Sequence, residues 1–262
     1  MSKKACVFVF SGTGMTNYVI LKTKDELNKM NMFLDVYEIE NTSMQDVHIQ
    51  DYDVMGIAYP VHSLNAPKIV IDFVKKLPIA NAKKTFIIST AGDRSKLNLA
   101  SSNLLLQIFN SKKYDVFYNR RFVMPSNFVF RNDDEVVGQR LETVCKEAVK
   151  TARAIYNNDS YKEKSNIISN VISIIGRLEW VGAKSMSKFF YTSSKCISCQ
   201  RCIGLCPNKN IVEQKGKITF NRNCGLCMRC IYMCPHTAIK IRGMFKFISI
   251  GNWYASEELK HK

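Results

Sequence analysis

Eight of the ten cysteines lie between Cys196 and Cys234, whereas Cys6 and Cys145 stand alone. They form two runs with the same spacing, CxxCxxCxxxCP: Cys196, Cys199, Cys202 and Cys206 before Pro207, then Cys224, Cys227, Cys230 and Cys234 before Pro235. In a reducing cytosol, clustered thiols are more often metal ligands than disulfide partners. Zinc sites use two CxxC pairs, which leaves the third cysteine of each CxxCxxC unexplained. The spacing therefore predicts iron–sulfur ligation rather than zinc or purely structural cysteines.

A second candidate site is a loop of small and hydroxyl-bearing residues near the start of the chain. Its six residues are Ser11, Gly12, Thr13, Gly14, Met15 and Thr16. Backbone N–H groups in such a loop, with the positive end of a following helix, bind a phosphate without any basic side chain. A dinucleotide fingerprint would need glycine where Asn17 stands, and a Walker loop would need Gly-Lys-Ser/Thr. A plain tight turn between strand and helix is the alternative.

The elements that must position these residues alternate between short apolar runs and segments of helical period. We expect five strands, at Ala5 to Phe10, Met32 to Glu38, Val54 to Ala58, Thr85 to Thr90 and Tyr114 to Val123. Helices are expected at Thr16 to Met30, Ala66 to Leu77 with Asn65 as its cap, Lys96 to Asn110 and Asp134 to Tyr156. This alternation predicts a doubly wound α/β fold with a parallel sheet of order 2-1-3-4-5.

Two further loops follow predicted strands at the edge of the sheet where such folds bind ligands. They contain the candidate cofactor-binding residues Pro60, Val61, His62, Thr90, Ala91, Gly92 and Asp93. His62, Asp93 and Asn127 are also candidates for orienting a small substrate, although each suits an ordinary loop position equally well.

The loop and cysteine patterns resemble two known families. The phosphate loop and its companion loops are similar to those around FMN in flavodoxins, and the cysteine runs resemble bacterial two-cluster ferredoxins. That resemblance implies that the fourth cysteine of each run serves the other cluster. One 4Fe-4S cluster would then use Cys196, Cys199, Cys202 and Cys234, and the other Cys224, Cys227, Cys230 and Cys206. The order of the parts resembles the flavodoxin/ferredoxin fusion proteins of anaerobic bacteria, which are taken to be electron carriers or reductase components.

We therefore expect four regions. Residues 1–156 form a flavodoxin-like FMN-binding domain, 157–190 a linker and connecting helix, 191–243 a small α+β ferredoxin-like domain and 244–262 a tail. Apolar residues recur at helical spacing from Ser165 to Phe190, which predicts an amphipathic helix packed between the two domains, with membrane-surface attachment as the lesser alternative. The aromatic tail is expected to dock on the rest of the molecule or to bind a partner.

Charge indicates which class of partner to expect, and hydropathy indicates the expected cellular location. The formal net charge is +16, and residues 191–243 hold nine basic residues and only one acidic residue, Glu213. We expect positive surface around Arg201, Arg222 and Arg229 to dock an acidic redox protein such as ferredoxin, and we expect no nucleic-acid partner. No secretory leader and no apolar stretch of about 20 residues is visible, so a cytoplasmic protein without a transmembrane segment is expected.

Three functions remain open on the sequence alone. The first is electron transfer between the clusters and FMN, to or from a protein partner, in either direction. The second is a reductase that acts directly on a small organic substrate at the flavin. The third is a redox sensor or regulatory module.

Overall fold

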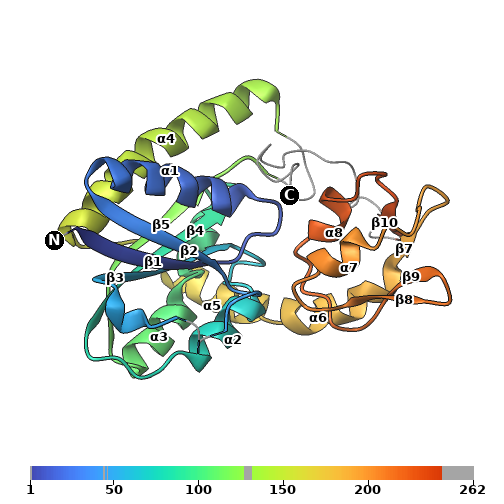
Figure 1. Cartoon of the computed structure of the whole chain (residues 1–262), viewed down its shortest axis with the longest axis horizontal. Helices are drawn as coiled ribbons and strands as arrows, with labels where there is room; N and C mark the ends of the chain where they lie inside the picture. Colours follow the sequence, from blue (N-terminus) through green and yellow to red (C-terminus); the bar gives the residue numbers. More distant parts are fainter. Residues whose placement is uncertain (1, 44, 46, 127–131, 244–262) are drawn as a thin grey trace.

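In a computed structural model, described here for residues 2–43, 45, 47–126 and 132–243, a parallel sheet is flanked by helices on both faces (Figure 1). The strands run in the order β2-β1-β3-β4-β5-β6. Their bounds are β1 (Lys3–Val9), β2 (Met32–Glu38), β3 (Val54–Pro60), β4 (Lys83–Ala91), β5 (Tyr114–Val123) and β6 (Tyr161–Lys162). The predicted order 2-1-3-4-5 is confirmed, which makes the fold flavodoxin-like.

Helices α1 (Met15–Lys29) and α4 (Asp134–Asn157) cover one face of the sheet, and α2 (Lys68–Lys76) and α3 (Asn103–Ser111) cover the other (Figure 1). The sheet separates two hydrophobic cores, one around Val7, Ile88 and Val144 and the other around Phe8 and Ile57. Strand β1 is fully buried from Ala5 onwards because side chains on both of its faces meet helices. This double coverage explains why its sequence is apolar at successive positions.

The structure differs from the predicted elements in several places. A sixth strand, β6, pairs with β5 where the sequence suggested only a linker. The helix expected over residues 96–110 is divided into a 3₁₀ helix, Lys96–Ala100, and α3. The division falls at buried Ser101 and Ser102, and the Ser102 hydroxyl donates to Asn119 Oδ1 at 3.0 Å and contacts the Tyr59 hydroxyl at 2.8 Å. Bonds from serine to distant partners compete with helical continuity at this point.

The single connecting helix predicted from Ser165 to Phe190 is instead two short helices, α5 (Ile167–Gly176) and α6 (Glu179–Met186), followed by a 3₁₀ turn at Ser187–Phe189. Asn65, predicted to cap α2, instead bonds to α5. Its Nδ2 donates to the Ser173 carbonyl at 2.7 Å, and the Ser173 hydroxyl donates to its Oδ1 at 2.8 Å. Helix α2 begins after Pro67 without a side-chain cap. The prediction of an Asn65 cap is therefore wrong, because this asparagine ties a distant helix to the loop after β3.

The cysteine-rich segment has a small core of its own and internal pseudo-symmetry. It comprises β7 (Phe190–Thr192), α7 (Arg201–Leu205), the hairpin β8 (Ile211–Gln214) and β9 (Lys217–Phe220), α8 (Arg229–Tyr232) and β10 (Ile239–Ile241), with β10 antiparallel to β7. Residues at equivalent places in the two cysteine runs adopt positive φ: Ser198 and Leu226, Gln200 and Met228, Lys209 and Thr237. The backbone N–H of Asn210 donates to Cys206 Sγ at 3.2 Å, and that of Ala238 donates to Cys234 Sγ at 3.3 Å. The two runs thus form two copies of one thiol-binding turn.

The side chain of Asn65 should be decisive for the attachment of α5. Replacing Asn65, which is 2% exposed, with alanine leaves the Ser173 hydroxyl and carbonyl without these partners. We expect a loss of about 1–3 kcal/mol in the free energy of unfolding, and faster amide hydrogen exchange across residues 167–176. The matched control is Asn110→Ala, at an exposed position near the end of α3. Equal exchange rates in the two variants would contradict this role for Asn65.

Candidate functional site

A pocket of about 210 Å³ lies where the loops after β1, β3, β4 and β5 converge at the carboxyl edge of the sheet. The predicted cofactor-binding residues that line it are Ser11, Gly12, Thr13, Met15, Thr16, Pro60, Val61, His62, Thr90, Ala91 and Gly92. These residues are separated by up to about eighty positions in the sequence, and the parallel topology brings them together because every strand ends at the same edge. We refer to this cavity as the loop pocket.

The first loop has the geometry of an anion site. Gly14 has φ 91°, a conformation that favours glycine, and its N–H donates to the Ser11 hydroxyl at 3.1 Å. Helix α1 then begins without a side-chain cap and without an acidic residue in its first turn. Its first N–H groups therefore have no capping partner within the helix, and the positive end of the helix faces no local carboxylate. Buried Thr16 contacts Thr90 through their hydroxyls at 2.9 Å, which fixes this loop against the loop after β4.

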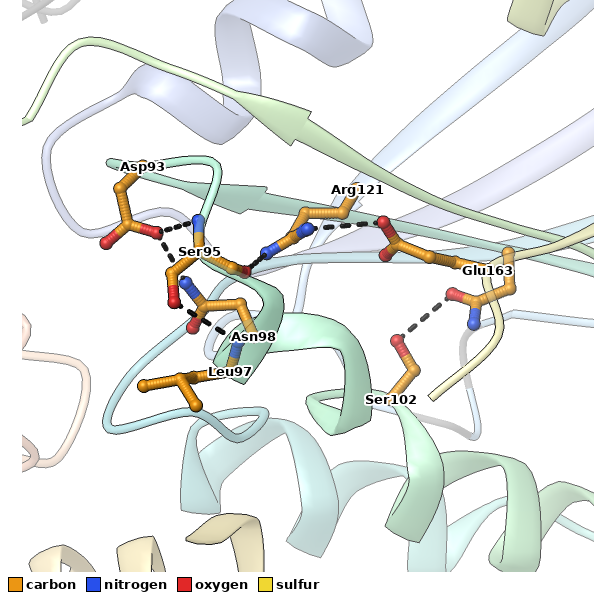
Figure 2. Close-up of polar contacts among 8 residues, drawn as sticks. Asp93, Ser95, Leu97, Asn98, Ser102, Arg121 and Glu163 are labelled. Atoms are coloured by element: carbon orange, nitrogen blue, oxygen red, sulfur yellow. Dashed lines mark hydrogen bonds and ion pairs between the residues drawn. The ribbon is translucent and has the colours of Figure 1, made fainter. Parts of the chain in front are cut away.

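Two predicted residues do not line the loop pocket. Gly14 lies behind the loop as the helix cap. The Asp93 carboxylate accepts bonds from Ser95 N at 2.7 Å and Asn98 Nδ2 at 2.9 Å, so it is used to form the turn into the following 3₁₀ helix (Figure 2). In the same region Arg121 binds the Ser95 carbonyl at 2.8 Å and contacts Glu163 at 3.3 Å. Asp93 thus stabilises this turn and does not line the loop pocket.

His62 lies in the wall of the loop pocket, with its ring edge toward Phe10. Burial lowers the pKa of His62 to about 4, so the imidazole is neutral near pH 7 and presents one donor and one acceptor nitrogen. Asn127, the third residue considered for substrate orientation, lies outside the described residues, as does the aromatic tail.

The pocket wall also contains residues that the sequence interpretation missed. Met124, Pro125 and Ser126 follow β5, and the rule that located the other loops would have found them. Leu226, Cys227, Met228 and Glu179 also line the pocket, although they come from the cysteine-rich segment and α6. Burial raises the pKa of Glu179 to about 7. Nothing in the local sequence marks these four as neighbours of the loop after β1.

The eight cysteines surround two separate cavities. Cys196, Cys199, Cys202 and Cys234 line a small one, and we call them the distal set. Cys206, Cys224, Cys227 and Cys230 line a second cavity of about 850 Å³, and we call them the proximal set because Cys227 also lines the loop pocket. In each set the fourth cysteine comes from the other run. This grouping supports the exchange of fourth cysteines that the ferredoxin resemblance implies.

The thiols interact electrostatically mainly within these two groups. Burial raises the pKa of Cys202 to about 11, and Cys196, Cys199 and Cys234 raise it further. Burial also raises the pKa of Cys230, with added contributions from Cys227, Cys224 and Cys206. Four crowded thiolates need a cationic core to offset their mutual repulsion. Among the described residues, no group of three or more His, Cys, Asp or Glu side chains is arranged to hold a single metal ion.

The cysteine-rich segment contacts the sheet through Arg229. The guanidinium pairs with Glu40 at 2.5 Å and donates to the Ser11 carbonyl at 2.6 Å. Only 5% of the Glu40 side chain and 15% of the Arg229 side chain are exposed. The expectation that Arg229 contributes to an open positive docking surface is therefore wrong, because its charge is used inside the molecule. Arg222, by contrast, is exposed.

Backbone packing also brings the loop after β1 close to the cysteine-rich segment. A Cβ atom added to Gly12 would lie 2.4 Å from the Cys227 carbonyl oxygen. Side chains other than hydrogen therefore have no room at position 12 without a backbone shift. Cys227 of the proximal set and the loop after β1 consequently lie in direct contact.

Comparisons with known proteins found one matching family and a set of similar solved structures. Residues 188–247 match the family described as the 4Fe-4S dicluster domain. No curated protein matches the chain. Solved structures similar to it include an archaeal flavodoxin (9% identity, 58% of this chain and 99% of that one, TM-score 0.38) and flavodoxin 2 from Bacillus cereus (11%, 59% and 99%, 0.44). Rubredoxin oxygen:oxidoreductase from Desulfovibrio gigas is also similar (13%, 59% and 38%, 0.36).

At these identities the fold assignment rests on the strand order of the sheet itself. The chain thus joins a flavodoxin-like α/β sheet to a segment that matches the 4Fe-4S dicluster domain, the organisation of a flavodoxin/ferredoxin fusion.

Proposed function

We propose that this protein is an iron–sulfur flavoprotein that passes electrons between two 4Fe-4S clusters and FMN. The observation that carries the proposal is the position of Cys227, which lines both the cavity of the proximal set and the loop pocket. When bound, FMN exchanges one or two electrons and each cluster exchanges one. The four regions expected from the sequence, from residues 1–156 to the tail at 244–262, are part of the same proposal.

The residues of the chain have distinct tasks in this proposal. Backbone N–H groups from Gly12 to Thr16 hold the phosphate at the start of α1. The loops after β3, β4 and β5 enclose the flavin ring, with neutral His62 able to bond to its polar edge. Each cysteine set holds one cluster, and the N–H donors at Asn210 and Ala238 stabilise thiolate charge on Cys206 and Cys234.

The spatial order of the sites defines an electron path. Cys202 of the distal set lies close enough to Cys230 of the proximal set to contribute to its pKa. The proximal set in turn borders the loop pocket. Electron tunnelling weakens steeply with distance, so contact between Cys227 and the phosphate loop favours exchange between the proximal cluster and the flavin. The distal cluster then serves the protein partner, in whichever direction electrons flow.

An acidic redox carrier such as ferredoxin remains the proposed partner in the cytoplasm. The cysteine-rich segment exposes Lys195, Lys209, Lys215, Lys217 and Arg222, whereas Glu213 is its one carboxylate. Complementary charge of this kind steers protein association. In the described residues no helix has the length and apolarity to span a membrane.

A reductase acting directly on a small organic substrate is the second candidate. Glu179 favours it, because a carboxyl group with a pKa raised to about 7 in the pocket wall can supply or accept a proton near neutral pH. Turnover of a small acceptor by the chemically reduced protein alone would favour the reductase over the carrier.

The cofactor content tests the main proposal. Protein prepared without oxygen should contain about eight iron, about eight sulfide and one FMN per chain, because two four-thiol sets and one loop pocket are present. Cys206→Ala should disturb the cluster of Cys224, Cys227 and Cys230 rather than that of its sequence neighbours, as seen by site-resolved spectroscopy. Stoichiometric zinc with little iron would overturn the proposal, and damage confined to the distal set would refute the exchange of fourth cysteines.

Gly12 should be indispensable for the contact between the two parts. In Gly12→Ala the new methyl group meets the Cys227 carbonyl, so the phosphate loop and the proximal set must separate. We expect weaker FMN retention and slower electron exchange between clusters and flavin, measured by flavin content and stopped-flow absorbance. Gly138→Ala is the matched control, because its Cβ would meet no atom within 4 Å. If the two variants behave alike, the close approach at Gly12 has no functional weight.

Arg229 should control internal electron transfer, whereas Arg222 should not. Arg229→Met leaves Glu40 as an uncompensated buried carboxylate, which costs about 3–5 kcal/mol in the stability of the junction. With a small neutral reductant that enters at the clusters, flavin reduction should be slower in Arg229→Met and unchanged in Arg222→Met. With an acidic protein donor at low salt, Arg222→Met should also be slower, and this difference should vanish at high salt. Equal internal rates in Arg229→Met and the parent protein would contradict the role of the ion pair.

A further inference from the structure

Helix α5 buries its polar side and exposes its apolar side, which is the reverse of an ordinary surface helix. Its inward stripe is small and polar: Ser169 and Ser173 are buried, and Gly176 packs so closely that a Cβ there would lie 2.2 Å from the Ser63 carbonyl oxygen. Asn103 Nδ2 donates to Asn170 Oδ1 at 2.6 Å on the same side. Apart from the partly buried Ile172, the aliphatic residues of the helix therefore face away from the protein. The prediction that this stripe packs between the two domains is wrong.

The outward stripe is continuous through α5 and into α6. Its exposed side chains are Ile167 (82%), Ile168 (64%), Val171 (52%), Ile174 (60%), Ile175 (58%), Leu178 (70%) and Val181 (70%). Their spacing of three and four residues places them on one helical face. Single exposed aliphatic residues are common on soluble proteins, but a contiguous group of seven marks an interaction surface.

The charges around this stripe identify the kind of partner. Lys162, Lys164, Lys184 and Lys188 are exposed beside it. The two carboxylates between residues 161 and 189 are partly buried, and Glu163 already pairs with Arg121. An apolar face bordered by lysines, without an exposed carboxylate, matches an anionic lipid surface. A second copy of this face would bring like charges together, which disfavours self-association.

We propose that the α5–α6 stripe binds the surface of an anionic membrane. The helices have ten and eight residues, so they lie along the interface with the aliphatic side chains among the acyl chains and the lysines at the headgroups. The seven aliphatic residues of the stripe line neither the loop pocket nor the cavities of the two cysteine sets, although Glu179 and Lys184 of α6 line the cavity of the proximal set. Its test therefore does not depend on the electron-transfer proposal.

Vesicle co-sedimentation of the anaerobically prepared holoprotein tests the proposal. Binding is expected to vesicles of phosphatidylcholine with phosphatidylglycerol, to weaken as salt rises, and to be much weaker with phosphatidylcholine alone. Replacing Val171, Ile174 and Leu178 together with serine should weaken binding at least about tenfold, because apolar insertion is lost. Each of Lys164→Gln and Lys188→Gln should weaken it about fivefold on the anionic vesicles. Unchanged flavin and iron contents would show that the variants are folded.

The matched control replaces two exposed apolar residues elsewhere, Phe33 and Ile79, with serine and should leave vesicle binding unchanged. Four results would overturn the proposal, and the first three concern vesicle binding. They are no binding of the parent protein to anionic vesicles, equal binding by the triple-serine variant, and equal loss in the control. A fourth is a dimer of the parent protein in light scattering that the triple-serine variant dissociates, because the stripe would then be covered by a second copy.

Discussion

The relation between the two parts depends on one buried ion pair. Arg229 lies between two cysteines of the proximal set, yet its guanidinium bonds to Glu40 and to the phosphate loop at Ser11. Burying either charge carries a large desolvation penalty, which is offset only while the two charges are paired. The pair therefore makes the docked arrangement specific, because a cysteine-rich segment docked in a shifted position would leave both charges buried without a partner. The contact between Gly12 and Cys227 is possible only in this arrangement.

The same junction explains why part of the carboxyl edge of the sheet is covered by the cysteine-rich segment and α6. In a doubly wound fold this edge is the ligand-binding edge, and here Leu226, Cys227, Met228 and Glu179 form part of its wall. A redox group bound in the loop pocket, as proposed, would be in contact with the segment that supplies the proximal thiols. Proximity is built into the covalent chain and does not depend on diffusion between separate proteins.

The unusual orientation of α5 follows from what lies beneath it. The loop after β3 and the 3₁₀ helix before α3 offer hydroxyl, amide and carbonyl groups, and Ser169, Ser173 and Gly176 meet that surface closely. An apolar inward face would leave those polar groups without partners. The aliphatic residues are consequently displayed outward beside exposed lysines, which is the basis for the proposed membrane contact.

The sequence by itself determined the two cysteine runs, the strand order and most of the loops that form the pocket. Cysteine spacing, apolar strands and glycine-rich turns are local signals, and each carries its own chemistry at short range. Periodicity also located α5, but it could not say which face is buried, because that depends on the polar surface of Asn65 and Ser63 far away in the chain.

Only the tertiary structure decided where Arg229 points, since a basic residue next to a cysteine looks like surface charge until Glu40 is found opposite it. Asp93 likewise looked like a pocket residue until its bonds to Ser95 and Asn98 were seen. In each case the deciding partner is a hydrogen-bond or charge complement, whose position is set by packing and leaves no trace in local residue spacing.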